Sequence, residues 1–292
     1  MAKTRTLVKR RKAIRNIRKI TKTMEMIATS RFKRALDRAS QAEGFTRKIS
    51  ELAADLSRSA GEQSHPLLEI RENPKKTLLL VLTSNRGLCG GYNASILREA
   101  NIRIRQSNAE KVPFDLEVSG KRGIGSFRFQ GVPVAESYLT FEDKPTYEQV
   151  EKLADKYIKM YRTREIDRVD VAYMKFISSS RQTPVVEQLL PFASLATPGQ
   201  APTGGSSGEY EFIPSVADIL DELVPVAFKV RLFKCFLDAA VSEQIARRIA
   251  MKAATEAAGD LIKSLSRQYN RARQGQITKE LAEIIAGAEA LK

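Results

Sequence analysis

The fold is decided by residues 14–56, which read IRNIRKITKTMEMIATSRFKRALDRASQAEGFTRKISELAADL. Starting at Ile14, alternating steps of three and four residues reach positions that are all apolar except Thr21, Arg31 and Arg38. This spacing is typical of a coiled-coil seam rather than of a broad face buried in a core. The positions are Ile14, Ile17, Thr21, Met24, Ala28, Arg31, Ala35, Arg38, Ala42, Phe45, Ile49, Leu52 and Leu56.

This seam lies inside a longer helical segment. Between Thr4 and Arg58 there is no proline and one glycine, Gly44, and strong helix formers dominate. Roughly 55 helical residues rise about 80 Å, so we expect the helix to project from any domain that this chain can build. Pro66 and Pro74 then predict a linker, which we assign to residues 61–74.

A second long helical segment begins at residue 215 and lasts almost to Lys292. We expect Pro225 to kink or restart it, and no proline follows between Val226 and Leu291. Because one compact domain separates the two helices, they bury their apolar faces most readily against each other as an antiparallel coiled coil. The apolar residues that recur in this segment are Val226, Val230, Phe233, Leu237, Val241, Ile245, Ile249, Leu261, Leu265, Ile277, Leu281 and Ile284.

The middle of the chain predicts an α/β domain over residues 75–214. Thr77–Leu82 is an uninterrupted apolar run, typical of a strand that is covered on both faces. Further strands are expected at 114–118, 168–177 and 185–190, and helices at 93–106, 121–129 and 146–163. Alternating strands and helices indicate a Rossmann-like, mostly parallel sheet. We interpret Thr197–Gly208 as a flexible loop. The predicted division is therefore a helix at 1–60, the linker, the α/β domain, and a helix at 215–292.

Composition limits the class of protein. The 292 residues are 42% hydrophobic, which suits a folded chain. Two cysteines, Cys89 and Cys235, cannot build a disulfide framework, and this favours a reducing compartment. No apolar run approaches the roughly 18–20 residues that cross a bilayer, and the first residues, MAKTRTLVKRRKAIRNIRK, lack the apolar stretch of a secretory signal. We expect a soluble, intracellular protein.

Residues 87–93, which read GLCGGYN, allow two interpretations. Their place after a buried strand and before a helix suggests a loop that binds a dinucleotide or phosphate. However, neither G-x-G-x-x-G nor a Gly-Lys-Ser/Thr sequence is present. We favour a tight turn whose glycines allow positive φ and close helix packing.

The sequence offers few residues suited to acid–base catalysis or to metal binding. The single histidine, His65, lies in the predicted linker, which argues against a catalytic triad. Cys89 could be a reactive thiol at a helix N-terminus, but we favour a small buried side chain. No Cys/His cluster has the spacing of metal ligands. We expect a chain that is non-catalytic by itself, with no cofactor and no metal.

The net charge of +15 is concentrated near the N-terminus. Residues 1–48 hold 16 Lys and Arg against 3 Asp and Glu, a net +13. Nucleic acid is one candidate partner, but the residues between the charges are isoleucines rather than aromatic stacking platforms. A solvated face is another interpretation, and we favour a basic face turned toward an acidic protein. Its residues are Lys9, Arg10, Arg11, Lys12, Arg15, Arg18, Lys19 and Lys22.

The stretches ITKTMEMIATS (20–30) and SNRGLCGGYN (84–93), with a third within residues 242–284, resemble motifs of the gamma subunit family of F-type ATP synthases. Residues 20–30, ITKTMEMIATS, are similar to the family's ITKAMEMVAAS, and residues 84–93, SNRGLCGGYN, to SDRGLCGGLN. The third lies near the C-terminus and comprises SEQIARRIAMKAAT (242–255), GDLIK (259–263), YNRARQ (269–274) and ITKELAEI (277–284). Together they span almost the whole chain in the family's order. Asn85 departs from the family, which has an acid there, and the predicted loop at 197–208 lacks the cysteines of chloroplast forms.

The resemblance implies a central rotor shaft. The terminal helices would form an antiparallel coiled coil inside a hexameric ring of alternating alpha and beta subunits, and the α/β domain would sit on the membrane ring of c subunits beside the epsilon subunit. Proton flow would turn the shaft and drive the catalytic beta sites through their states. No nucleic acid would be bound, and membrane association would run through these partners only, at the cytoplasmic face of a bacterial plasma membrane.

The resemblance also implies roles for particular residues. In the family, polar residues of the shaft contact the surrounding ring of alpha and beta subunits, here called the sleeve. The matching positions in this sequence are Arg247, Gln274, Thr278 and Glu280, and Met24 matches the family's neck position. The basic face defined above would meet an acidic lever loop of the beta subunits. The middle motif contributes the turn Arg86, Gly87, Leu88, Cys89, Gly90 and Gly91. A shaft that turns inside a sleeve also needs small side chains, and Ala28, Ala35, Ala39, Ala250, Ala253, Ala254, Ala257 and Ala258 fit that need or simply favour helix.

Overall fold

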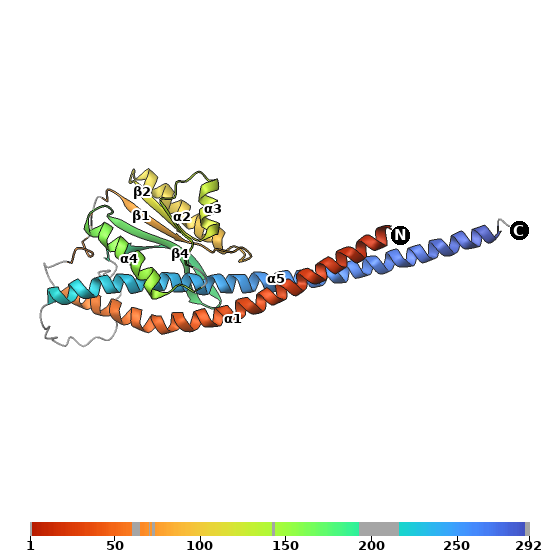
Figure 1. The fold of residues 1–292 in the computed structure, drawn as a ribbon, viewed down its shortest axis with the longest axis horizontal. Helices are drawn as coiled ribbons and strands as arrows, with labels where there is room; N and C mark the ends of the chain where they lie inside the picture. Colours follow the sequence, from red (N-terminus) through yellow and green to blue (C-terminus); the bar gives the residue numbers. More distant parts are fainter. Residues whose placement is uncertain are drawn as a thin grey trace. The chain divides into compact units, whose positions relative to one another are not determined.

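Two long helices bracket an α/β region (Figure 1). The computed structural model describes residues 2–59, 65–69, 71, 74–141, 144–192 and 216–289. Helix α1 spans Ala2–Ser59 and helix α5 spans Val216–Glu289. The chain forms two compact units, a helical unit of Met1–Ser30 with Arg247–Lys292 and an α/β unit of Arg31–Ala246. Each unit is described by itself below.

Helix α5 passes Pro225 without interruption, so of the two outcomes expected at this proline, a kink or a restart, the restart does not occur. Proline has no amide hydrogen, and the carbonyl of Asp221, four residues earlier, therefore loses its helical partner. Leu220 and Val224, in the same turns, are both buried in the core of the α/β unit. We attribute the continuity of the helix to this packing, which outweighs the cost of one missing hydrogen bond.

In the helical unit, α1 and α5 run antiparallel. Thr255 donates a hydrogen bond to the hydroxyl of Thr21 at 2.8 Å, and the guanidinium of Arg11 lies 5.1 Å from the ring centre of Tyr269. Lower numbers in α1 therefore meet higher numbers in α5. The buried and half-buried residues of α5 here include a series spaced by steps of three and four residues, as a coiled-coil seam requires. The series comprises Met251, Thr255, Ala258, Ile262, Leu265, Tyr269, Ala272 and Gln276.

Most of the large apolar residues that the sequence assigned to this part of the seam are exposed instead. Of that set only Leu265 lies on the seam, whereas Ile249, Leu261, Ile277, Leu281 and Ile284 are all more than half exposed. The last three also lie at the end of α5. Since Arg11 faces Tyr269, the first residues of α1 pair near residue 278, and α5 continues beyond them without a helix opposite.

The α/β unit holds a five-stranded sheet in the order β3-β2-β1-β4-β5. The strands are β1 (Thr77–Leu82), β2 (Phe114–Ser119), β3 (Glu136–Tyr138), β4 (Arg168–Ser178) and β5 (Arg181–Leu190). All neighbouring pairs are parallel except β4 and β5, which form an antiparallel hairpin. The mostly parallel sheet predicted from the sequence is confirmed, and the short strand β3 is an addition to it.

Helices cover both faces of this sheet (Figure 1). Successive side chains of a strand point to opposite faces. Leu78, Leu80 and Leu82 accordingly enter one core with α1, α4 (Tyr147–Arg162) and α5, whereas Leu79 and Val81 enter the other with α2 (Tyr92–Ala109) and α3 (Lys121–Phe129). This double coverage explains why the β1 run is apolar throughout.

Within the α/β unit the predicted seam positions Ala35 and Ile49 are buried, but two others are displaced by one residue. Thr46 and Ala53 are buried, whereas Phe45 and Leu52, which the three-and-four spacing selected, are 58% and 52% exposed. A straight helix has 3.6 residues per turn and drifts away from a 3.5-residue repeat. The predicted loop Thr197–Gly208 lies outside the described residues.

Candidate functional site

Most of the predicted basic face lies on the exposed surface of α1 in the helical unit. Lys9, Arg10, Lys12, Arg15, Arg18, Lys19 and Lys22 are exposed, and Lys22 pairs with Glu25 at 3.1 Å. Arg11 is only half exposed because it packs over the ring of Tyr269 on α5. Arg11 thus contributes to the helix pairing, while the other seven cations lie on the exposed surface.

The helical unit is joined by small side chains. Ala28 on α1 and Ala258 on α5 are buried, at 1% and 4% exposure, and the two threonines 21 and 255 share a hydrogen bond. Small residues on both helices allow their backbones to approach closely. The same Thr255 hydroxyl lies 2.8 Å from the carbonyl oxygen of Met251, a second acceptor for its single proton. The alanines proposed from the sequence as small shaft residues therefore lie in different places. Ala28 and Ala258 lie on the seam, whereas Ala253 and Ala257 are exposed.

The residues predicted to contact a surrounding sleeve lie in different environments. Gln274, Thr278 and Glu280 are exposed on α5, with Thr278 donating to the carbonyl of Gln274 and Glu280 accepting from Gln276. Arg247, in contrast, is 9% exposed and Met24 is half-buried. The surface around the first three also carries Ile277, Leu281, Ile284 and Ile285, all more than half exposed. Sequence reasoning counted three of these isoleucines and leucines as seam residues and so missed the apolar surface.

The middle motif forms a tight turn between β1 and α2. Asn93 accepts a hydrogen bond from the amide of Ser84 and donates to the Ser84 hydroxyl and to the Cys89 sulfur, at 3.0, 2.8 and 3.2 Å. Cys89 is 2% exposed, so the prediction of a buried side chain is confirmed. Two residues have positive φ, Gly90 at 57° and Leu88 at 66°. A Cβ at Gly87 would lie 2.7 Å from the Arg122 guanidinium, the flexible end of a side chain that can move aside.

Asn85, where the family pattern has an acid, connects this turn to two neighbours. Its carbonyl oxygen accepts from the amide of Lys121 at the start of α3, and its amide donates to the carbonyl of Phe141. A carboxylate could make only the first of these contacts. Beside the turn lies a cavity of about 320 Å³ at the carboxyl ends of β1 and β2, whose charged lining residues are Arg86, Lys121 and Glu243.

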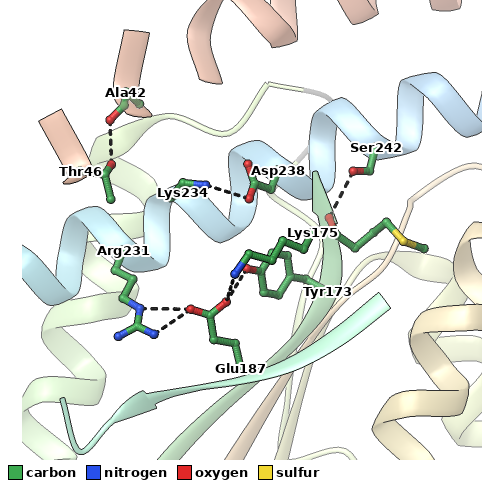
Figure 2. A network of polar contacts seen from close by, with 10 residues as sticks. Ala42, Thr46, Tyr173, Lys175, Glu187, Arg231, Lys234, Asp238 and Ser242 are labelled. Atoms are coloured by element: carbon green, nitrogen blue, oxygen red, sulfur yellow. Dashed lines mark hydrogen bonds and ion pairs between the residues drawn. The ribbon is translucent and has the colours of Figure 1, made fainter. Parts of the chain in front are cut away.

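A polar network joins α5 to the β4–β5 hairpin (Figure 2). The Glu187 carboxylate on β5 accepts from Arg231 of α5 at 2.7 Å, from the Tyr173 hydroxyl at 2.7 Å and from Lys175 at 3.3 Å. Burial acts to raise the pKa of Glu187, but the charge and hydrogen bonds of Arg231, with those of Tyr173 and Lys175, hold it at about 2. Nearby, the Ser242 hydroxyl donates to the carbonyl of Met174.

His65 is buried and serves the junction after α1. Its Nδ1 accepts from the amide of Leu67 at 3.1 Å, so this nitrogen carries no proton and Nε2 carries it. Nε2 lies 3.4 Å from a carboxylate oxygen of Asp221 and 3.2 Å from Arg162. Burial lowers the pKa of His65; Asp221 acts to raise it and Arg162 to lower it. Within the described ranges, no group of three His, Cys, Asp or Glu side chains could hold a metal ion.

No helix in the described part of the chain is long and apolar enough to cross a membrane. The fold itself matches solved structures of rotary ATP synthases. A chain of the Euglena gracilis mitochondrial ATP synthase (OSCP/F1/c-ring, rotational state 3) aligns with a TM-score of 0.68 at 17% identity, covering 99% of this chain and 95% of that one. A chain of the Tetrahymena thermophila mitochondrial ATP synthase, from a structure of the central stalk and c-ring, aligns with a TM-score of 0.59 at 22% identity, covering 80% and 99%.

Comparison of the sequence with those of known proteins identifies the family within this fold. A family model described as ATP synthase matches residues 3–291. The ATP synthase gamma chain of Rhodopirellula baltica is 56% identical over 296 residues and covers all of both chains, and that of Chlorobaculum tepidum is 40% identical over 286 residues and covers 97% of each. The chain belongs to the ATP synthase gamma chain family, and the resemblance found in the sequence is confirmed.

Proposed function

We propose that this chain is the central rotor shaft of an F-type ATP synthase. It couples proton flow through a membrane ring of c subunits to the conformational cycling of catalytic beta subunits, and it is non-catalytic by itself. The observation that carries this proposal is the full-length match to gamma chains, at 56% identity to a bacterial one. The paired antiparallel helices and the α/β unit support it, because a shaft needs a stiff helix pair and a part that can be gripped.

The partners follow from this role. The helix pair would turn inside the alpha and beta subunits of the catalytic hexamer, and the α/β unit would contact the epsilon subunit and the c-subunit ring. The Euglena and Tetrahymena structures contain a c-ring with related chains, which supports this arrangement. Association with the membrane would run through these partners, at the cytoplasmic face of the bacterial plasma membrane. No nucleic acid is required for any step.

Within this function we assign three contact regions, together with the four-part division of the chain at residues 60, 74 and 214. The exposed cations of α1 would face acidic elements of the beta subunits as they pass. Arg247, Gln274, Thr278 and Glu280 would make the polar contacts between shaft and sleeve, and Met24 would contact the sleeve at the neck of the shaft. The turn from Arg86 to Gly91 leaves Leu88 exposed on the α/β unit, whose partners would be the epsilon subunit and the c-subunit ring. Contacts with the sleeve bias a beta subunit only if they differ between its successive states.

The test is reconstitution with purified alpha and beta subunits. The intact chain, or a chain truncated after Gln274, is mixed with them, and complex formation and ATPase turnover are measured. We expect the intact chain to assemble and to raise turnover, while the isolated chain hydrolyses no ATP. The truncated chain should assemble and support less turnover, because it lacks the exposed apolar end of α5. An intact chain that neither assembles nor changes turnover would exclude the rotor function.

A further inference from the structure

Helix α5 is held in the α/β unit by polar contacts from four different elements. Lys229 pairs with Glu151 and Asp155 of α4 at 3.0 and 2.9 Å. Arg231 pairs with Glu187 of β5 at 2.7 Å (Figure 2). Two further hydrogen bonds involve backbone carbonyls: Tyr92 of α2 donates to Ala239 at 3.1 Å, and Ser242 donates to Met174 of β4 at 3.2 Å. All these residues lie within one compact unit.

The two ion-paired cations project from opposite flanks of the helix. An α-helix turns about 100° per residue, so side chains two positions apart differ by about 200° in direction. Lys229 therefore reaches α4 on one side, while Arg231 reaches the hairpin on the other. Both side chains are largely buried, at 17% and 18% exposure, which limits screening by solvent.

The apolar core restrains the rotation of α5 less directionally than the ion pairs do. Between these ion pairs α5 packs on the sheet through buried residues such as Phe228, Leu232 and Cys235. The hydrophobic effect depends on buried area and has no direction, so it resists separation more than rotation of the helix about its own axis. Hydrogen bonds weaken steeply away from their preferred geometry. Because the ion pairs lie on both flanks, rotation of the helix in either direction would stretch the contacts on one flank.

We propose that Lys229 and Arg231 form an anti-roll brace that fixes the rotational setting of α5 against the α/β unit, so that torque passes between them without slip. The proposal rests on the rotor function given above and specifies the joint through which that function works. The Glu187 side of the brace is the stronger one, because its carboxylate accepts hydrogen bonds from two nitrogens of Arg231 and is held by Tyr173.

The test measures the stiffness of this joint in the reconstituted complex. The beta subunits are fixed to a surface, and a bead is attached to the α/β unit through Gln130→Cys, an exposed site at the end of α3. The native thiols of Cys89 and Cys235 are both buried, at 2% exposure, so labelling is selective. The angular variance of the bead during pauses reports torsional stiffness. This variance is compared between the parent chain and the double variant that carries both Lys229→Met and Arg231→Met.

We expect the variance of the double variant to rise roughly twofold, because two of four directional restraints are removed, while ATPase turnover is unchanged. Each single variant should give part of this rise. Lys263→Met is the matched control, since it removes an exposed ion pair with Asp260 on the same helix and should leave the variance at the parental value.

The outcomes separate the two proposals. A parent complex that shows no ATP-driven rotation refutes the rotor function. Rotation with equal variance in parent and double variant refutes the brace alone. If the methionine variants do not assemble, Glu187→Gln is used, since it keeps the shape of the side chain and removes the charge. Failure of both the methionine variants and Glu187→Gln to fold would also overturn the proposal, because the contacts would then be required for stability rather than for angular setting.

Discussion

Glu187 keeps a charged carboxylate largely out of water, and its stabilising contribution depends on pH. Its pKa is about 2 in the folded chain and 4.5 as the reference for an unfolded one. A group whose pKa is lower in the folded state stabilises that state above the unfolded pKa. The contribution is therefore present at neutral pH and is lost as the pH falls from about 4.5 toward about 2.

We predict that Glu187→Gln lowers the free energy of unfolding by about 3 kcal/mol at pH 7, which is the size of the linkage term. Urea unfolding of the full-length chain at several pH values measures this difference. The gap between variant and parent should shrink below pH 4.5, where the parent loses its own contribution. Glu283→Gln, at an exposed pair with Lys279, is the control and should change little at any pH. A gap that does not depend on pH would contradict the assigned charge state.

Single residues differ in how far their surroundings can be predicted from sequence. The burial of Cys89 followed from its place in a turn between a strand and a helix. The pairing of Glu187 with Arg231 did not, because the two lie 44 positions apart and neither belongs to a local pattern. Arg11 and Arg15 belong to one charged run, yet Arg11 packs on Tyr269 whereas Arg15 is exposed. Only the phase of the helix decides which cation turns inward.

At the scale of elements, the entry into α3 depends on one glycine. Gly120 has φ of 101°, and a Cβ at this position would lie 2.1 Å from the carbonyl oxygen of Thr83. We predict that Gly120→Ala costs about 3 kcal/mol or more, because strain and a clash with backbone add together. Gly125→Ala, inside the same helix with open space around it, should instead stabilise by about 0.5–1 kcal/mol. Thermal unfolding of both variants tests the pair, and equal effects would refute the argument.

The seam of the helical unit offers a second matched pair. We predict that Ala258→Leu destabilises this unit by about 1–3 kcal/mol, because the larger side chain forces apart two helices that touch through small residues. Ala257→Leu, on the exposed side of α5, should stay within about 0.5 kcal/mol of the parent. Circular dichroism at 222 nm during heating follows the loss of helix. Equal melting curves for the two variants would show that Ala258 does not lie on the seam.

Elements with a strong local pattern were predicted well. The apolar run of β1 and the helix at 121–129 agree with the structure residue for residue. Strand β3 was missed because Glu136–Tyr138 is three residues long and mostly exposed, so it carries no alternation. The predicted α1 seam is largely confirmed, since Thr21, Ala28, Ala35 and Ile49 are buried, and it departs from the structure at a few positions. Over many turns a small drift of the helix moves Phe45 and Leu52 outward and brings Thr46 and Ala53 inward.

For the whole molecule, we expect the end of α5 to matter for function but little for the stability of the isolated chain. We predict that truncation after Gln274 leaves the melting temperature of the isolated chain nearly unchanged, since Ile277, Leu281 and Ile284 are exposed and bury little area. Differential scanning calorimetry of the two chains measures this. A fall of several degrees would mean that these residues pack within the chain. Combined with the reconstitution, an unchanged melting temperature would show that any lost turnover arises from contacts with the other subunits.

The function came from motifs spread over the whole chain rather than from a reactive site. Composition and spacing alone indicated two long helices and an α/β domain, and three family stretches then specified the role. Individual contact residues such as Gln274 and Glu280 remain predictions. Their importance lies in a surface on another subunit, and neither the sequence of one chain nor its fold contains that surface.

The seven-residue repeat of the helical unit restricts how the length of such a rod can change. Adding one residue to α5 alone would turn everything beyond it by about 100° and move Ala258 away from its partner helix. Insertions of three or four residues would locally overwind or unwind the pair. Only matched additions of whole heptads to both helices keep the small side chains in phase. Engineered variants of different length should therefore come in discrete steps of about 10 Å.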